Sequence, residues 1–309
     1  NKKGYKVTIY EKDEKVGGLL RFGIPDFKLE KKVIDRRVKI LEKEGIIFQT
    51  SKCLGKDVTI DRLDSKYDAI ILCIGSSIPK DIGIEGRELE GIHFAMDFLT
   101  MQNRINSNLK TDTNINAKNK NVIVLGGGDT GSDCIGTCNR HGAKTITQIE
   151  LLPRPPKERD KSMMWPLFAN TFKTSSSHEE GCDRVWGIKA KEFVGKDKIE
   201  YVRTEDISWD KHNKNFYIVK NSEKLIPCDL LLIAIGYESP NLFFDDQFSI
   251  DLMSDGRIKA DNKNFLTSKE NFFTCGDSRR GQSLVVWAIK EGRDCAESVH
   301  NYLKKKQLT

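Results

Sequence analysis

The sequence has no apolar run long enough to cross a membrane. Its longest strongly apolar stretch, Leu230 to Gly236, is far shorter than the roughly 20 residues that a spanning helix needs. The first residues lead directly into a strand pattern, and the last ones, from Lys304 to Thr309, carry no lipidation or retention signal. We therefore expect a chain that neither spans a membrane nor is anchored to one.

Cys-x-x-Cys pairs are also absent, although the chain contains eight cysteines. Neither zinc nor iron–sulfur ligand spacing is met, so no metal site is predicted. Cys134 and Cys138 lie four residues apart in a predicted helix and resemble a metal or redox pair. Free cysteine is also a common small buried residue, and we favour that interpretation. Unpaired cysteines indicate a reducing compartment such as the cytoplasm, with an organelle left open because the native N-terminus is expected upstream.

A concentrated basic surface is missing as well. The 309 residues include 51 Lys and Arg and 45 Asp and Glu, which gives a net charge of +6. The basic residues are spread evenly and are not interleaved with aromatics, so we expect no nucleic-acid partner. A chain of this length is long enough for two domains.

Short β-branched runs alternate with helical stretches along the chain, which is typical of parallel α/β architecture. Gly45 ends the first predicted helix, and residues 185–233 are expected to form several antiparallel strands. The predicted strands are Lys6–Tyr10, Ile46–Thr50, Ala69–Ile74, Val122–Leu125, Ile146–Ile149 and Leu230–Ile235, and the helices are Val33–Gly45, Thr130–His141 and Val285–Leu303.

The strongest motif is the run Gly126-Gly127-Gly128-Asp129-Thr130-Gly131, which follows a predicted strand and opens a predicted helix. In this context a G-x-G-x-x-G run indicates a dinucleotide site. The first glycine permits the tight turn, the second lets the backbone approach the pyrophosphate, and the third lets the helix pack closely on the strand. The first-turn amides would face the diphosphate at the positive end of the helix dipole.

Glu150 ends the next predicted strand, near the position where an acidic residue binds the ribose 2′-hydroxyl of NAD. A carboxylate there would repel the 2′-phosphate of NADPH, which favours NADH. Arg154 and Arg159 argue the other way, because either could reach a 2′-phosphate. We expect NADH as the donor and keep NADPH possible.

The two ends of the chain suggest a second dinucleotide fold, for a flavin. Val7–Glu11 is a strand that ends in an acid, and Glu11 would hydrogen-bond an adenosine ribose. Near the other end, Phe272 to Asp277 is typical of a strand that ends in Gly-Asp. We expect the loop carboxylate to meet ribityl or phosphate groups and the following helix N-terminus to face the flavin ring.

Several long motifs resemble the glutamate synthase small-subunit family, and the similarity covers essentially the whole chain. The stretch Gln148 to Arg159 is most similar to the C-terminal FAD/NAD module of the eukaryotic NADH-dependent form, in which this module is fused behind a large synthase region. The motifs that carry the resemblance are Val16 to Glu30, Gly91 to Leu99, Gly126 to Asp133, the His178-Glu-Glu segment and Ser283 to Gly292.

The resemblance implies two Rossmann-like domains, with an FAD domain interrupted by an inserted NAD(P)H domain. Gly75 and Gly236 match strand-end motifs where the chain crosses between domains, and each is either a ligand contact or a turn glycine. Residues implied to contact FAD by matching motif are Glu11, Gly18, Leu19, Gly276, Asp277, Leu284, Val285 and Val286.

Two features of the family are missing from these residues. Family members carry a first strand and a G-x-G-x-x-G ahead of the position of Tyr5, and a cysteine-rich extension that resembles an iron–sulfur ligand set. We therefore expect an N-terminally truncated chain whose first FAD βα unit is missing. The expected division is residues 1–100 as the first, truncated segment of the FAD domain, 101–121 as an exposed linker, 122–238 as the NAD(P)H domain and 239–309 as the second segment of the FAD domain.

The resemblance implies an electron-input module of glutamate synthase. NADH would reduce FAD, and iron–sulfur clusters and FMN outside this chain would carry the electrons to a large synthase region, fused or separate. That region would form glutamate from glutamine and 2-oxoglutarate. Two alternatives stay open: a related reductase module that feeds another acceptor, and a degenerate scaffold without turnover.

No catalytic side chain is predicted. The five histidines show no spacing that indicates a triad or a metal site, and hydride transfer between cofactors needs no side-chain acid or base. These histidines are His93, His141, His178, His212 and His300.

Overall fold

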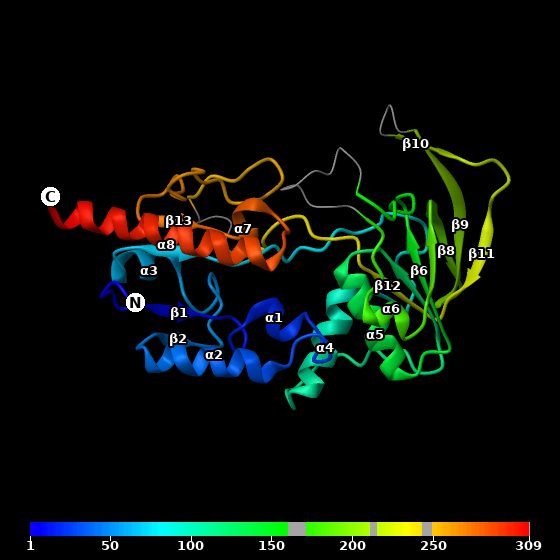
Figure 1. Ribbon diagram of the computed structural model, residues 1–309, viewed down its shortest axis with the longest axis horizontal. Coiled ribbons are helices and arrows are strands. Elements are labelled where there is room, and N and C mark those ends of the chain that lie inside the picture. Colours follow the sequence, from blue (N-terminus) through cyan, green and yellow to red (C-terminus); the bar gives the residue numbers. More distant parts are fainter. Residues whose placement is uncertain (160–170, 211–214, 243–248, 309) are drawn as a thin grey trace. The chain divides into compact units, whose positions relative to one another are not determined.

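A computed structural model describes residues 1–159, 171–210, 215–242 and 249–308 (Figure 1). Contacts divide the chain into two compact units, and each is assembled from separate stretches of sequence. Unit 1 comprises Asn1–Gly18, Lys32–Lys80 and Gly236–Thr309, and unit 2 comprises Leu19–Lys31 and Asp81–Ile235.

Unit 2 is built around a parallel sheet of five strands in the order β4-β12-β5-β6-β7. All four neighbouring pairs of strands run parallel, with β5 beside both β12 and β6. The strands are β4 (Ile92–Phe94), β5 (Asn121–Leu125), β6 (Thr145–Glu150), β7 (Asp183–Trp186) and β12 (Leu230–Ile233).

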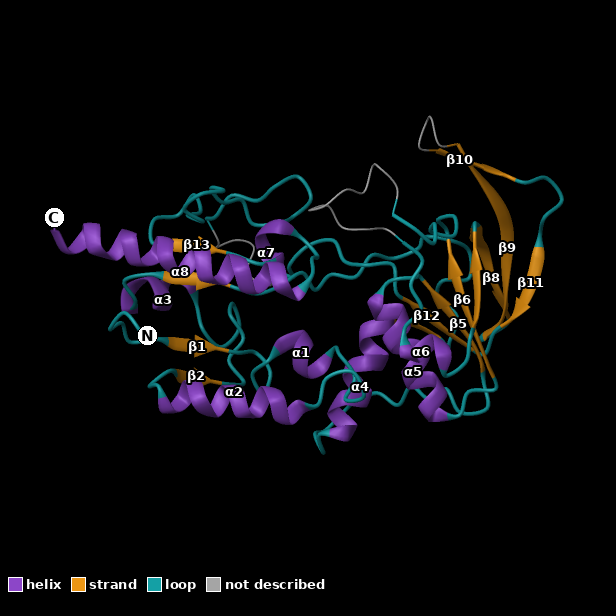
Figure 2. Cartoon of the chain, viewed as in Figure 1, coloured by secondary structure: helices purple, strands orange, loops and turns teal. Residues whose placement is uncertain are grey.

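The sheet is covered on both faces, which is why its central strands are continuously apolar. Val122 and Val124 of β5 belong to one buried cluster with residues of α4 and α5. Ile123 and Leu125, which point to the opposite face, belong to another cluster with residues of β8 and β9. Alternate side chains of one strand therefore fill two separate cores, and Figure 2 shows helices on one side of the sheet and strands on the other.

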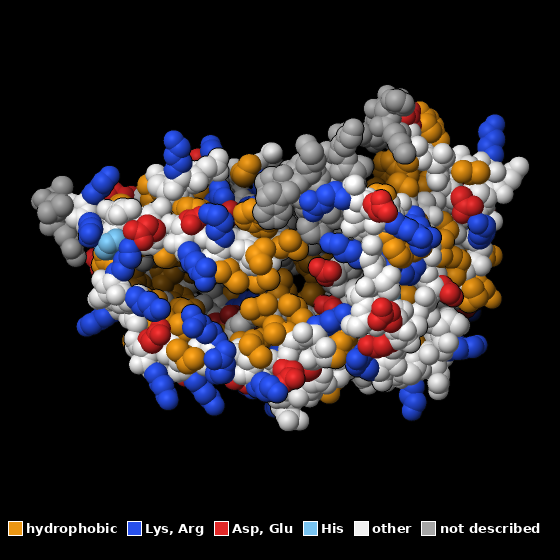
Figure 3. Space-filling model, in the orientation of Figure 1, with side chains coloured by type: hydrophobic (Ala, Val, Ile, Leu, Met, Phe, Trp, Pro, Cys, Tyr) orange, Lys and Arg blue, Asp and Glu red, His pale blue; other side chains and the backbone are white. Residues whose placement is uncertain are grey.

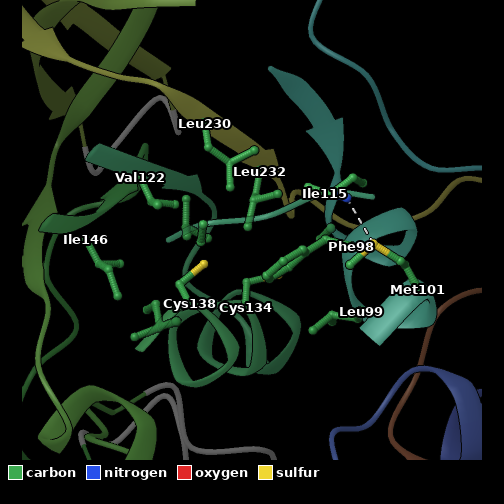
Figure 4. Packing of buried hydrophobic residues seen from close by; sticks show 14 residues of the cluster. Phe98, Leu99, Met101, Ile115, Val122, Cys134, Cys138, Ile146, Leu230 and Leu232 are labelled. Carbon is green, nitrogen blue, oxygen red and sulfur yellow. Dashed lines mark hydrogen bonds between the residues drawn. The ribbon is translucent and has the colours of Figure 1, made fainter. Parts of the chain in front are cut away.

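The helical layer is formed by α4 (Ala95–Asn106), α5 (Asp129–His141) and the short α6 (Ser176–Glu179). Phe98 of α4 packs with Cys134 and Cys138 of α5 against the sheet (Figure 4), and all three side chains are fully buried. The two cysteines are therefore part of the core, which is the interpretation that the sequence favours. Gly142 ends α5 in the left-handed conformation, with a φ of 75°.

The other layer is an antiparallel sheet centred on the long strand β9 (Ile199–Asp210). This strand pairs with β8 (Ile188–Gly195) along most of its length, with β11 (Lys224–Pro227) near its start and with β10 (Asn215–Ile218) near its end. Phe193 and Val202 point from this sheet into the second core.

Unit 1 contains two separate two-stranded parallel sheets, β1-β2 and β13-β3. The long helix α8 packs on β13, where Cys295 joins Phe273 and Cys275 in a small buried cluster. The elements of this unit are β1 (Thr8–Tyr10), α2 (Lys31–Lys43), β2 (Ile47–Gln49), α3 (Ile60–Lys66), β3 (Ile70–Leu72), β13 (Phe272–Thr274), α7 (Asp277–Arg280) and α8 (Val285–Leu308). The remaining helix, α1 (Gly18–Phe22), contains the point where the chain passes from unit 1 to unit 2.

Three expectations about the chain's organisation need correction. Residues 81–121 belong to unit 2, so the predicted boundary at residue 100 does not follow the contacts. The predicted linker 101–121 is also not simply exposed, since Met101, Asn103 and Ala117 are buried. Finally, the strands of residues 185–233 are not all antiparallel. β7 overlaps the start of this range and β12 forms its end, and both are parallel members of the main sheet.

Among the described residues, no helix is both long and apolar enough to span a membrane.

Candidate functional site

The glycine turn lies where β5 ends and α5 begins, at the centre of the parallel sheet. Gly126 has a φ of 115°, a conformation that L side chains rarely adopt, and a Cβ there would overlap the carbonyl oxygen of Ala234 just beyond β12. The chain leaves β5 towards β6, while β12 lies on the other side of β5. The turn therefore occupies a switch point of strand order, where ligands of open α/β sheets bind.

The other two motif glycines meet different surroundings. A Cβ on Gly131 would overlap the carbonyl oxygen of Gly126, so this glycine lets the first turn of α5 lie directly against the loop. Gly128, the residue before α5, has no atom within 4 Å of the position that a Cβ would take. Its backbone thus faces open space at the amino end of a 13-residue helix, which is the geometry that a pyrophosphate requires.

Two further predicted residues open the same helix. Asp129 is its first residue and is exposed, and Thr130 follows it with intermediate exposure. Both lie in the first turn, where backbone amides are not used by helix hydrogen bonds.

Glu150 lies over the glycine turn. A Cβ on Gly127 would overlap its carboxylate, so the side chain folds back towards the loop. Arg184 of the neighbouring strand β7 approaches it, with 3.8 Å between Nη2 and Oε1. Burial raises the pKa of Glu150, and the positive charge of Arg184 opposes that rise.

A buried hydrogen-bond network beneath the turn was not predicted from sequence. Gln148 of β6 is fully buried, and its Nε2 donates to the carbonyl oxygen of Gly126 at 2.9 Å. Its Oε1 accepts from Nε of Arg184 and contacts Nε2 of His178, each at 3.1 Å. Gln148 differs from the alternating apolar residues of its strand, and that irregularity is the one sequence signal that could have marked it.

His178 holds the other end of this network. Its Nδ1 accepts a hydrogen bond from the backbone N–H of Ser175, which closes a capping box at the start of α6. Nε2 therefore carries the proton and donates to Gln148. Burial, together with the charges of Arg184 and Lys28, lowers the pKa of His178 to about 4, so the ring is neutral at physiological pH.

Arg154 is exposed beyond the end of β6 and stacks on aromatic rings. Its guanidinium carbon lies 4.4 Å from the ring centroid of Phe172 and 5.2 Å from that of Trp186. Arg184 contacts the same two rings. Arg184 therefore contacts the rings on which Arg154 stacks and also approaches Glu150. Arg159 is exposed in the same loop.

In unit 1, Glu11 directly follows β1, as predicted. Its Oε1 accepts a hydrogen bond from the backbone N–H of Asp13 at 3.0 Å, and burial raises its pKa. Gly75 follows β3 with a φ of 74° and has open space beside it. Gly236 lies against the side chain of Gln282, which also accepts a hydrogen bond from the N–H of Tyr237.

Gly276 and Asp277 form the start of α7, at the carboxyl end of β13. The N–H of Gly276 donates to Glu291, and Asp277 accepts a hydrogen bond from the hydroxyl of Ser283 at 2.7 Å. Asp277 thereby fixes the loop that leads into α8.

The residues around the start of α8 present apolar side chains to solvent, and hydrophobic side chains reach the surface there in Figure 3. Leu284, Val285 and Val286 are 43%, 46% and 60% exposed, and Trp287 is 44% exposed. An exposed apolar group at a helix N-terminus fits the flat ring of a flavin. Gly18 and Leu19 lie in α1 on either side of the crossing between units, and Leu19 is 52% exposed.

The structure thus groups the motif glycines, Asp129, Thr130 and Glu150 of unit 2 around one turn, whereas Arg154 stacks on the rings of Phe172 and Trp186. Most of the predicted flavin residues of unit 1 lie at strand ends and at the start of α8. In the described part of the chain no cluster of His, Cys, Asp and Glu could hold a metal ion. His93, His141 and His178 are partly buried, with pKa values lowered by burial. His212 lies outside the described residues.

The model of the pyridine nucleotide-disulphide oxidoreductase family matches residues 2–292 of this chain, and the chain belongs to that family. Solved structures agree on the fold: Mycobacterium tuberculosis FprA in complex with NADPH superimposes with a TM-score of 0.72 at 17% identity, covering 97% of this chain and 78% of that one. The fold is accordingly that of two Rossmann-like, dinucleotide-binding domains.

Within that family the chain groups with the glutamate synthase small chains and with the matching part of the NADH glutamate synthases. It is 42% identical to glutamate synthase [NADH] of Schizosaccharomyces pombe over 315 residues, which is 97% of this chain and 15% of that protein. It is 39% identical to the glutamate synthase [NADPH] small chain of M. tuberculosis over 309 residues, 97% of this chain and 62% of that one. The chain therefore spans only part of these relatives.

Proposed function

We propose that this chain is the electron-input module of a glutamate synthase and that it takes its electrons from NADH. The observation that carries the proposal is the glycine turn at the switch point, with open space before Gly128 and the carboxylate of Glu150 over Gly127, in a chain that groups with the glutamate synthases.

The residues of unit 2 fit a bound dinucleotide. Gly128 leaves room for the pyrophosphate, and the first turn of α5 supplies unpaired amides at the positive end of the helix dipole. Gln148 holds the carbonyl oxygen of Gly126, which keeps the turn in shape without a ligand. Glu150 is then the acceptor for the ribose 2′-hydroxyl.

The residues of unit 1 fit a flavin in the same way. Glu11 would accept from the adenosine ribose, and Gly276 and Asp277 would meet the ribityl or phosphate groups. The exposed side chains of Leu284, Val285 and Val286 would cover the ring, with the remaining contacts at Gly18, Leu19, Gly75 and Gly236. When bound, NADH supplies a hydride and FAD accepts it, while the protein's role is to position the two rings.

NADH is the proposed donor because the carboxylate of Glu150 lies against Gly127 of the turn, from where it would repel the 2′-phosphate of NADPH. Arg154 weakens this preference, since its exposed guanidinium could reach a 2′-phosphate from the rings of Phe172 and Trp186. The named relatives include both an NADH enzyme and an NADPH enzyme, so they do not decide between the two donors. The proposal of NADH therefore rests on the charges at this site.

The remaining steps lie outside this chain. We propose that iron–sulfur clusters and FMN carry the electrons onward to a large synthase region, fused as in the S. pombe relative or present as a separate subunit. That region would form glutamate from glutamine and 2-oxoglutarate. A cytoplasmic location stays a prediction.

The decisive experiment follows the flavin absorbance of the purified full-length protein under anaerobic conditions. We expect NADH to bleach the flavin bands faster than NADPH does, and glutamate to accumulate when glutamine and 2-oxoglutarate are supplied. Flavin bleaching without glutamate formation would instead indicate a reductase module for another acceptor. A protein that binds flavin but is not reduced by either nucleotide would exclude an electron-input role.

A further inference from the structure

Three cysteines gather at the carboxyl ends of β3 and β13 in unit 1. The two strands are parallel and paired in register, from Ile70 with Phe272 to Leu72 with Thr274. Cys73 and Cys275 are the next residues of each strand, so they form the following pair along the same ladder. Their sulfur atoms lie 3.4 Å apart.

This spacing is close to that of a disulfide. The bond itself is about 2.0 Å long, so the sulfurs need to approach by roughly 1.4 Å. Neighbouring strands lie about 4.8 Å apart, within the range of about 4.4–6.8 Å that Cα atoms of a disulfide span. The bond can therefore form by small side-chain movements without re-pairing the strands.

The surroundings of Cys275 favour its thiolate. Hydrogen bonds from Cys295 and Cys73 lower the pKa of Cys275, while burial opposes them; the positive charge of Arg279 adds to the lowering and the negative charge of Glu291 acts against it. The hydrogen bond to Cys275 raises the pKa of Cys73, so attack by Cys73 is the slower of the two exchange steps and attack by Cys275 the faster. The thiolate is the nucleophile in thiol–disulfide exchange.

Exposure differs within the trio and sets the order of events. Cys73 is exposed, whereas Cys275 is 4% exposed and Cys295 of α8 is fully buried. A small oxidant in solution therefore reaches Cys73 first, and the buried Cys275 reacts second, as the resolving thiol.

We propose that Cys73 and Cys275 form a reversible disulfide when the protein meets a low-molecular-weight disulfide. Cys73 first attacks that disulfide, which forms a mixed disulfide and releases one small thiol. Cys275 then attacks the sulfur of Cys73, which forms the protein disulfide and releases the second small thiol. In total the two cysteines lose two electrons and two protons, and the oxidant gains both.

The Cys73–Cys275 pair lies next to two proposed flavin contacts, Gly276 and Gly75. Cys275 directly precedes Gly276, whose N–H donates to Glu291, and Cys73 lies two residues before Gly75. The disulfide would tie together two strand ends that carry proposed flavin contacts. Its formation does not depend on the proposed function, because the bond is detected in the polypeptide itself.

The test treats the full-length protein with oxidised glutathione, blocks the remaining thiols and maps the peptides by mass spectrometry. We expect a cross-linked peptide that joins Cys73 to Cys275, and its loss after dithiothreitol. In Cys275→Ser the mixed disulfide should remain trapped on Cys73, and in Cys73→Ser no cross-link should form. Cys134 and Cys138, fully buried on α5, serve as the internal control and should stay reduced.

Several outcomes overturn the proposal. A stable glutathione adduct on Cys73 of the wild-type protein would show that Cys275 does not resolve it. A cross-link between Cys275 and Cys295 would show that the wrong pair was chosen, and complete lack of modification would show that Cys73 is not accessible. Since the wild-type peptide map distinguishes these outcomes by itself, poor folding of the Cys275→Ser variant would not affect the conclusion.

Discussion

The three glycines of the nucleotide turn differ in what surrounds them, and this difference separates folding from binding at single residues. Gly126 and Gly131 each leave no room for a Cβ because backbone oxygens of the same unit lie there. Gly128 faces open space and has a φ of −77°, which any residue can adopt. The fold therefore requires the first two glycines, whereas it does not require the third, which we propose to be needed for the dinucleotide.

We expect Gly131→Ala to destabilise the protein by roughly 1–3 kcal/mol, because the new methyl group must displace the backbone of the turn. Gly128→Ala should change the free energy of unfolding by less than about 0.5 kcal/mol, because nothing is displaced. The same variant should bind NADH at least about tenfold more weakly, since the methyl group occupies the approach of the pyrophosphate. Urea unfolding and NADH titration of both variants measure the two effects, and equal loss of stability would contradict the assignment.

At Glu150 we expect Glu150→Ala to raise the KM for NADH by about tenfold, which corresponds to about 1.4 kcal/mol. The KM for NADPH should change less or fall, because removal of the carboxylate leaves Arg154 and Arg184 to attract the phosphate. Glu200→Ala, which removes an exposed carboxylate from β9, is the matched control and should affect neither nucleotide. Equal losses for NADH and NADPH would show that Glu150 does not contact the ribose.

At the scale of elements, α6 depends on a neutral histidine. His178 accepts the N–H of Ser175 and donates to Gln148, so a second proton on the ring would break the capping box. Its pKa is lowered to about 4 in the folded protein, against about 6.5 when the chain is unfolded. Below pH 6.5 the unfolded chain binds the proton first, so this contribution to stability is complete above pH 6.5 and is lost as the pH falls towards 4.

We expect the wild type to lose about 1–2 kcal/mol more stability than His178→Gln between pH 7 and pH 5, measured by urea unfolding. Asp133, whose pKa burial raises to about 6, contributes stability that decreases as the pH rises from 3.8 to 6. That opposite trend is present in both proteins and cancels in the difference. Parallel pH profiles of the two proteins would show that His178 is not responsible.

Elements with a local signal can be predicted from sequence, and those held by distant partners cannot. The strand, turn and helix from Asn121 to His141 agree with the prediction because the β-branched run and the glycines are local signals. The polar end of α4 resembles a linker in sequence, since Asn103 owes its burial to hydrogen bonds from its Nδ2 to the carbonyl oxygens of Phe22 and Gly23, about 80 positions away. In the same way, no local pattern indicates that β7 runs parallel to β6.

At the scale of the whole molecule, the sequence predicts two dinucleotide-binding folds, and the family match and solved structures agree. The exact division is less predictable, because each unit is made of separate stretches. The segment Leu19–Lys31 illustrates the reason: its motif places it with the flavin half, yet Phe27 stacks under Arg140 of α5 at 3.6 Å and fits against Gly136. Its membership in unit 2 depends on these contacts and not on its motif.

The division into two units predicts which residues NADH protects from hydrogen exchange. NADH at about 100 times its Kd should stabilise the unit that binds it by about 2.7 kcal/mol. In hydrogen exchange of the full-length flavoprotein, we expect NADH to protect residues 126–131 and 148–150 most strongly, because the amides of the turn and the carboxyl end of β6 lie at the proposed site. Gly128→Ala should lose this protection while its exchange without nucleotide stays like that of the wild type. Protection confined to unit 1 would contradict the site, since NADH would then bind without using the glycine turn.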